Sequence, residues 1–172
     1  MNLIFRLLCV LWGAWRRPGI QAMEASAVVF HVWPLDLDIN LHLTNSRYLA
    51  LMDLGRTDLI LRSGMWKIMK RERLAVVLGG AAMRFRRSLA PFARFTLTSR
   101  VLGWDERWVY VEQVFTGPQG VACSAVLRAA FLKNGKVVLP ETLFAELLPG
   151  VAAPPLPEWV RPWMEVESAF AG

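Results

Sequence analysis

Residues 36–48 of the chain read DLDINLHLTNSRY. This stretch follows a predicted strand over residues 27–33 and leads into a predicted helix over residues 46–62. Carboxyl, imidazole, hydroxyl and amide groups gather in it beside strongly apolar neighbours. Because the start of a helix supplies unpaired backbone N–H groups and the positive end of the helix dipole, it can stabilise an oxyanion. A carboxylate beside it can attack a carbonyl group or activate water, so the stretch is a candidate catalytic site.

The same residues also fit a purely structural interpretation. Aspartate and asparagine often form turns and cap helices by bonding to nearby backbone groups. Thr44 or Asn45 can cap the predicted helix in this way. Taken one by one, the residues favour this local interpretation. Four residues at fixed spacing favour a functional site when taken together: Asp38, His42, Asn45 and Tyr48.

The chain beyond the predicted helix follows the period-two pattern of antiparallel strands. Four strands are predicted, over residues 74–85, 95–98, 108–115 and 123–133. Asn134-Gly135 then marks a tight hairpin, with a short returning strand over residues 136–139. A sheet of this kind must bury one face, and the long helix is its natural cover. The order of elements therefore predicts an α+β fold in which a curved antiparallel sheet wraps one central helix.

The composition is that of a folded, basic protein. The chain has 172 residues, of which 55% are hydrophobic and 20% charged, with a formal net charge of +6. That length can bury a core without disulfide bonds, and the two cysteines, Cys9 and Cys123, give no disulfide framework. The two histidines and two cysteines are widely separated, so we expect no metal site, and we expect no cofactor.

The N-terminal segment is apolar from residue 3 to residue 15, which is shorter than the roughly 20 residues of a spanning helix. It predicts an amphipathic helix whose polar side carries Arg6 and Arg17. The first interpretation is packing on the domain or across a dimer. The alternatives are peripheral membrane contact through residues 1–17 and a cleaved signal peptide. We expect a cytoplasmic protein, with membrane association as the alternative.

Three regions are expected along the chain. They are an N-terminal helix over residues 1–19, the sheet domain over residues 20–150, and a tail containing proline and tryptophan over residues 151–172. Trp159 and Trp163 are possible anchors of that tail onto the domain.

The stretch from residue 36 to residue 48 resembles the D-x-D-x-x-x-H-x-N-N-x-x-Y signature of hot-dog thioesterases of the 4-hydroxybenzoyl-CoA type. The resemblance continues through Gly55-Arg56 and residues 85–89 and 102–105, which look like the branch named thioesterase superfamily member six. It covers roughly residues 28–140. The resemblance implies a hot-dog fold and hydrolysis of an acyl thioester.

The resemblance also implies roles for single residues. Asp38 aligns with the carboxylate that acts as nucleophile or base, and His42 with a histidine that orients the loop. Asn45 and Tyr48 match the helix start, where backbone amides polarise the thioester carbonyl, and Asp53 matches an acidic position facing the acyl pocket. In one place the sequence departs from the signature: threonine, at position 44, replaces its first asparagine and removes an amide donor.

Arg84, Arg86 and Arg87 form a basic cluster at the end of a predicted strand. Guanidinium groups bind phosphates well, and coenzyme A carries phosphates, so the cluster is a candidate dock for it. The structural alternative is a sheet edge protected by charge. Nucleic acid is not expected as a partner, because aromatic residues do not interleave with the basic ones as a stacking platform requires.

The sequence thus predicts an acyl-CoA thioesterase. The alternative is a non-catalytic hot-dog protein that binds acyl chains or a membrane surface, and a hot-dog dehydratase is a weaker third. A homodimer or tetramer is expected, because a single curved sheet has two edges and exposed edges are a liability.

Overall fold

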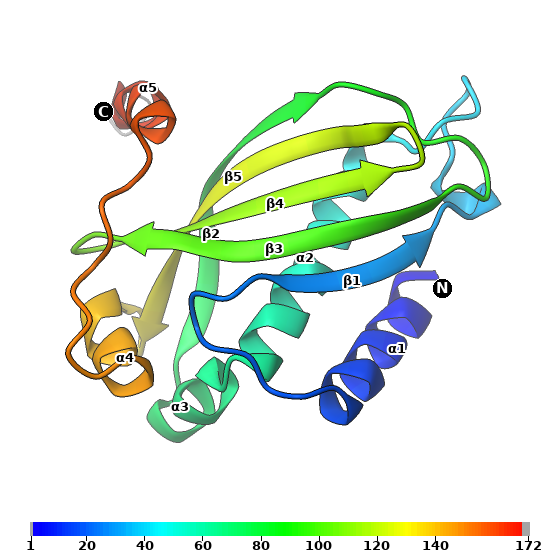
Figure 1. Cartoon of the computed structure of the whole chain (residues 1–172). Helices are drawn as coiled ribbons and strands as arrows, with labels where there is room; N and C mark the ends of the chain where they lie inside the picture. The colour runs from blue at the N-terminus through cyan, green and yellow to red at the C-terminus, as the bar shows by residue number, and fades with distance from the viewer. Residues whose placement is uncertain (1, 170–172) are drawn as a thin grey trace.

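The computed structural model describes residues 2–169, and its centre is the helix α2 (Asn45–Arg62) under a curved antiparallel sheet (Figure 1). The strands are β1 (Ser26–His31), β2 (Ala75–Phe85), β3 (Arg94–Trp104), β4 (Val109–Gly117), β5 (Gly120–Lys133) and β6 (Lys136–Val138). The order across the sheet is β1-β3-β4-β5-β2, and β6 pairs with β5. This is the α+β, hot-dog arrangement that the sequence predicts.

The predicted hairpin after β5 is confirmed. Asn134 and Gly135 have φ values of 53° and 78°, the left-handed conformation that this dipeptide adopts readily. Neither α3 (Met65–Glu72), which begins directly after Gly64, nor the helix at the end of the tail was predicted. The helix α3 buries Met65, Ile68 and Met69 under the far end of the sheet domain.

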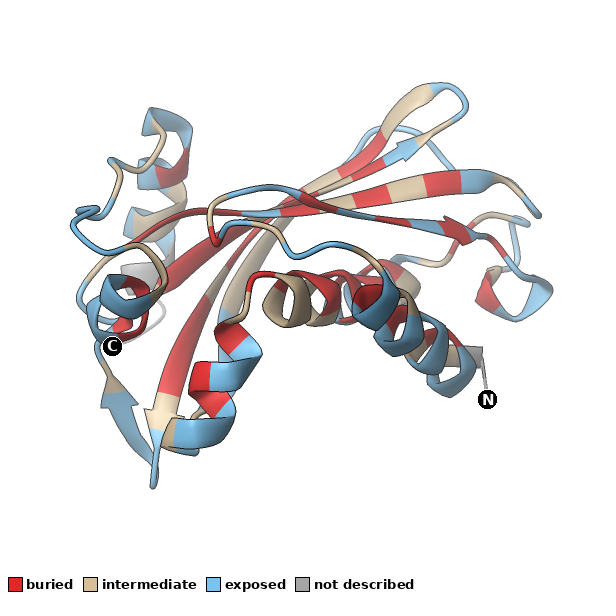
Figure 2. Cartoon of the chain, turned by 60° about the horizontal axis from the view of Figure 1, so that its bottom comes forward, coloured by how far each residue is buried: buried red, intermediate tan, exposed pale blue. Residues whose placement is uncertain are grey.

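The main core lies between α2 and the inner face of the sheet, where Figure 2 shows the buried residues. Gly55 marks the closest approach of the two layers. A Cβ atom there would lie 2.7 Å from both the Leu97 Cδ2 and the Ser99 Oγ atoms, and 2.9 Å from Gln113 Nε2. Only glycine allows the backbone of α2 to pack this close to the sheet.

The C-terminal tail covers part of the outer face of the sheet. After α4 (Pro140–Leu147), the tail ends in η2 (Glu158–Val160) and α5 (Arg161–Ala169), on the side of the sheet opposite α2 (Figure 1). Val160 is buried, and the rings of Trp163 and Tyr110 lie 6.4 Å apart. Trp163 is therefore an anchor as predicted, whereas Trp159 is largely exposed.

The N-terminal helix α1 (Asn2–Arg16) packs along α2 and beside β1 as predicted, but its inner face is only partly the predicted apolar stripe. Leu7, Val10 and Ala14 face the core, and the helix is rotated so that a polar residue joins them. Arg6 is buried on the inner side, whereas Leu8, Trp12 and Trp15 are exposed on the outer side. The prediction for Arg6 was wrong because periodicity identifies the two faces of a helix but not the partner of each face. No helix within residues 2–169 has both the length and the apolar character that crossing a membrane requires.

We predict that Gly55→Ala lowers the free energy of unfolding by about 1–3 kcal/mol, because the added methyl group must push α2 away from the sheet. Urea unfolding followed by circular dichroism measures the change. Gly13→Ala in α1 is the matched control, since a Cβ there meets only the Arg17 side chain, at 3.6 Å. The control should be neutral or slightly stabilising. Equal stability of the two variants would contradict the close approach at Gly55.

Candidate active site

The loop of residues 33–44, called the Asp38 loop below, is folded around the carboxylate of Asp38. Leu37 and Leu43 pair as an antiparallel bridge and close the base of the turn. Inside it, Asp38 Oδ1 accepts the backbone N–H of Asn40 at 2.8 Å and that of His42 at 3.2 Å. Asp38 Oδ2 accepts no hydrogen bond from residues 2–169. The carboxylate is therefore fixed through one oxygen while the other stays available.

His42 takes part in this turn through its backbone. Its N–H donates to Asp38 Oδ1, and its carbonyl oxygen accepts the Asp38 N–H at 2.9 Å. Leu41 between them has a φ of 57°, which a leucine rarely adopts. The turn is thus of the local type that the structural interpretation expected. These bonds involve only the backbone of His42, so the role of its side chain stays a prediction. The same geometry also holds the Asp38 carboxylate for chemistry.

The helix α2 begins directly after the Asp38 loop. Thr44 occupies the cap position but makes no side-chain capping bond, so the predicted cap by its hydroxyl is absent. The Thr44 N–H donates to the carbonyl oxygen of Asp36 at 2.9 Å, and its carbonyl oxygen accepts the Arg47 N–H. Asn45 is the first helical residue and is exposed. The N–H groups of Asn45 and Ser46 precede Arg47, have no acceptor one turn back in the helix, and can receive an anionic oxygen.

Tyr48 lies one turn into α2 and is buried in the core. Its ring is 5.1 Å from that of Phe85 and 4.8 Å from that of Phe115. Burial, with a smaller contribution from Cys123, raises the pKa of Tyr48 to about 12. Tyr48 therefore stays protonated at neutral pH, and its side chain fixes the start of α2 against the sheet.

Asp53 lies on α2 with its side chain exposed, at the end of a polar chain that runs into the core. Its carboxylate pairs with Arg56, and Arg56 Nη1 donates to Gln113 Oε1 at 2.7 Å. Gln113 Nε2 in turn donates to Ser99 Oγ at 2.7 Å and to the Met52 carbonyl oxygen at 3.0 Å. Burial lowers the pKa of Arg56, while its contact with Asp53 opposes the shift.

The sequence analysis missed Gln113 as part of this chain. The alternation of β4 could have identified it, because Gln113 occupies an inward position between the buried Val111 and Phe115. Asp53 and Arg56 also line a depression of about 210 Å³ between α2 and β2, together with Val76 and Leu78. This depression is the nearest observed counterpart of the pocket wall predicted for Asp53.

The three arginines of the basic cluster are separated by the sheet. Arg84 and Arg86 line a groove of about 440 Å³ with Trp159 and Trp163, on the face that the tail covers. Arg87 points away from that groove, and its Nη1 donates to the Gln119 carbonyl oxygen at 2.5 Å. The sequence could not place the tail beside Arg84, because the two segments are far apart along the chain.

Arg87 belongs to the turn that supports the Asp38 loop. Two residues after it, the carbonyl oxygen of Leu89 accepts the N–H of Leu43 at 3.0 Å. Arg87 itself bonds to Gln119 and Ala122, so its connection to the Asp38 loop runs along the chain, through Leu89. Within residues 2–169, no group of three or more His, Cys, Asp or Glu side chains is arranged to hold a metal ion.

The family model described as "Thioesterase-like superfamily" matches residues 32–164. The chain belongs to the thioesterase-like superfamily. The matched range begins directly after β1 and ends within α5, so it includes the Asp38 loop, α2 and strands β2 to β6. The family resemblance on which the hot-dog prediction partly depended is thereby confirmed.

Individual members of the superfamily agree with this assignment. Thioesterase lcsJ from Purpureocillium lilacinum is 33% identical over 141 residues, which cover 67% of this chain and 46% of that protein. Protein THEM6 from Xenopus laevis is 40% identical over 96 residues, which cover 56% of this chain and 46% of that protein. The chain spans about half the length of these relatives. The solved structure of YbaW, a probable thioesterase from Escherichia coli, matches with a TM-score of 0.65 and 25% identity, covering 71% of this chain and 95% of that one.

Proposed function

We propose that the chain hydrolyses acyl-CoA thioesters with Asp38 as the catalytic residue. The observation that carries the proposal is the position of its carboxylate: one oxygen is held by the amides of its own loop, and the loop leads directly into the first turn of α2. Membership of the thioesterase-like superfamily supports the same chemistry.

The proposed reaction uses the two parts of the site for two tasks. The carbonyl oxygen of the thioester receives the N–H groups at the start of α2, beside Asn45, which stabilise the negative charge that develops there. Asp38 Oδ2 either attacks the carbonyl carbon or takes a proton from the attacking water. In both routes the C–S bond breaks and coenzyme A leaves as the thiol. If Asp38 attacks, water then hydrolyses the mixed anhydride and frees the carboxylate. In either route one water supplies the oxygen and proton of the free acid and the proton of the thiol.

We predict that Asp38→Asn lowers kcat/KM for acyl-CoA hydrolysis by at least about 100-fold, because it removes the charge that both routes need. The amide oxygen of asparagine can still accept the two loop N–H groups, so the melting temperature should change little. A thiol-release assay across acyl chain lengths measures the activity. Glu106→Gln, in an exposed turn, is the control for removing a carboxylate elsewhere. Near-normal turnover of Asp38→Asn would refute its role, and an inactive wild type would favour the non-catalytic alternative.

Coenzyme A is proposed to place its phosphates against Arg87. The guanidinium group of Arg87 is exposed in the turn that supports the Asp38 loop. Arg84 and Arg86 were predicted to share this role, but they lie on the outer face of the sheet. Their part in binding coenzyme A stays a prediction, and the structure favours Arg87 within one protomer.

We further propose that the active protein is a homodimer in which two β2 strands meet. β2 is an 11-residue strand at the edge of the sheet, and its apolar residues Val76, Val77 and Leu78 are exposed. A long apolar edge of this kind is a template for pairing. At the tip of the Asp38 loop, Ile39 is 98% exposed, and a second protomer would cover this apolar surface.

Light scattering at micromolar concentration should give twice the mass of the chain. Val76→Lys with Leu78→Lys should give the monomer, because pairing at β2 would bury both charges. Val29→Lys is the matched control: it adds a lysine to an exposed valine of the opposite edge strand, β1, and should leave the dimer intact. A wild-type monomer that hydrolyses acyl-CoA would overturn the dimeric site.

The outer face of α1 is proposed to contact an anionic lipid surface. It exposes Leu8, Trp12 and Trp15, the last of these with 87% of its surface. The exposed Arg16 follows directly, and its guanidinium carbon lies 4.0 Å from the centre of the Trp12 ring. Tryptophan and arginine side by side on an apolar face are typical of helices that lie in the membrane interface.

Vesicle flotation tests this contact. The wild type should float with vesicles that contain phosphatidylserine and float less with neutral vesicles, because the chain carries a net charge of +6. Replacing Leu8, Trp12 and Trp15 with glutamine should abolish flotation. Trp159→Gln, an exposed tryptophan of the tail, is the control and should float like the wild type. If the wild type stays in the unbound fraction, α1 serves only to pack on its domain.

A further inference from the structure

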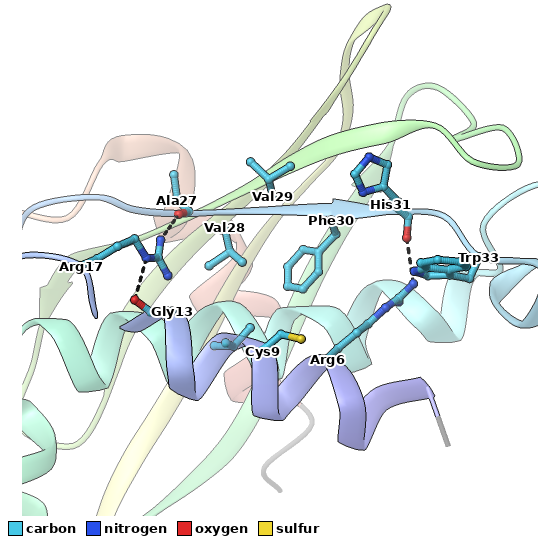
Figure 3. Close-up of a pocket in the computed structure, with 11 residues that line it drawn as sticks. Arg6, Cys9, Gly13, Arg17, Ala27, Val28, Val29, Phe30, His31 and Trp33 are labelled. Carbon is cyan, nitrogen blue, oxygen red and sulfur yellow. Dashed lines mark hydrogen bonds between the residues drawn. The ribbon is translucent and has the colours of Figure 1, made fainter. Parts of the chain in front are cut away.

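Arg6 of α1 is a buried cation that faces the base of the Asp38 loop. Its side chain is only 6% exposed. One nitrogen, Nη2, donates to the Asp36 carboxylate at 2.5 Å and to the His31 carbonyl oxygen at 2.8 Å (Figure 3 shows the second contact). A buried charge is retained only with a partner, so the inner face of α1 is matched to this carboxylate.

Asp36 connects that cation to both ends of the Asp38 loop. Its carboxylate is fully buried, and the oxygen that meets Arg6 also accepts the Trp33 N–H at 2.9 Å. The other oxygen lies 3.6 Å from Arg47 Nε. Its backbone carbonyl accepts the N–H of Thr44, the cap residue of α2. A shift of Asp36 would therefore move the loop and the helix start relative to each other.

We propose that Arg6 is a positioning residue for Asp38: through Asp36 it fixes the Asp38 carboxylate relative to the first turn of α2. This inference rests on the proposed role of Asp38 in thioester hydrolysis. Asp36 lies two residues before Asp38, and the two residues are joined only by Leu37. Displacing reacting groups by about 1 Å can lower a rate about 100-fold, so loss of Arg6 acts on turnover more than on substrate binding.

Arg17 provides a matched control on the same face of the N-terminal segment. It lies about three helical turns after Arg6 and pairs with Asp58, a second fully buried carboxylate, which is located on α2. Arg17 also donates to the carbonyl oxygens of Gly13 and Ala27 (Figure 3). None of these partners belongs to the Asp38 loop. Arg17 thus secures the N-terminal segment without touching the candidate site.

The experiment compares Arg6→Gln with Arg17→Gln in the full-length chain. Both variants should have lower melting temperatures, because each leaves a buried carboxylate without its closest cation. Arg6→Gln should lower kcat for acyl-CoA about 10- to 100-fold with KM changed less than about threefold. Arg17→Gln should keep kcat within about twofold. Arg6→Lys, which restores the charge, should recover part of the lost kcat.

Hydrogen exchange supplies a measure that does not need activity. The N–H groups of Asp38, His42 and Thr44 are hydrogen-bonded inside the loop and should exchange faster in Arg6→Gln than in Arg17→Gln. If the wild type hydrolyses no thioester but Arg6→Gln still exchanges faster, the proposed function is wrong, whereas the contact by which Arg6 positions the loop is supported. Unchanged kcat in Arg6→Gln, or an equal loss of kcat in Arg17→Gln, would overturn the proposal.

Discussion

Two fully buried carboxylates, Asp36 and Asp58, set the arrangement of the N-terminal half of the molecule. Asp36 lies in the Asp38 loop that precedes α2, and Asp58 lies within α2 near its end. The N-terminal segment supplies an arginine to each. Buried ion pairs add little net stability compared with apolar packing, but removing one partner costs about 3–5 kcal/mol. The pairs therefore specify where α1 lies more than they strengthen the fold. Because the two cations share the inward side of the N-terminal segment with Val10 and Ala14, another part of the apolar surface of α1, with Leu8, Trp12 and Trp15, is left outside.

A network of polar side chains lies between the middle of α2 and the sheet. Gln113 is fully buried, and its amide links Ser99 on β3 to the Met52 carbonyl and the Arg56 guanidinium on α2. Gly55 lets the helix approach close enough for these bonds to form. The buried amide of Gln113 has partners at both ends, so the network fixes the register of helix against sheet. Burial of the Arg56 guanidinium still opposes its charge, and the contact with Asp53 offsets part of that cost. The helix α2, and with it the proposed oxyanion position at its start, is thereby held by the sheet as well as by its loop.

The sequence predicted most of the sheet and the loop that leads into α2, because these depend on local signals. Period two identified the strands, Asn134-Gly135 identified the hairpin, and the residues from Asp38 to Tyr48 identified the loop and helix start. The orientation of α1 was not predictable in the same way. It depends on pairing Arg6 with Asp36, 30 residues away, and no periodicity reports such a partner. Strand alternation predicted that Arg84 and Arg86 share a face without Arg87, and both line one groove. The tail beside them was not predictable, because it lies far away along the chain.

The two edges of the sheet differ in a way that limits how far it can grow. On β1, the outward carbonyl oxygens of Ala27 and His31 are occupied by guanidinium groups of Arg17 and Arg6, and α1 stands beside the strand. On β2, the outward edge has no neighbouring strand among the described residues. If two copies pair through their β2 strands, each outer edge of the joined sheet is a β1 strand. Because the β1 edge is covered, no third copy can be added. The arginines that orient α1 thus also keep a further strand from pairing with the outer edge of β1.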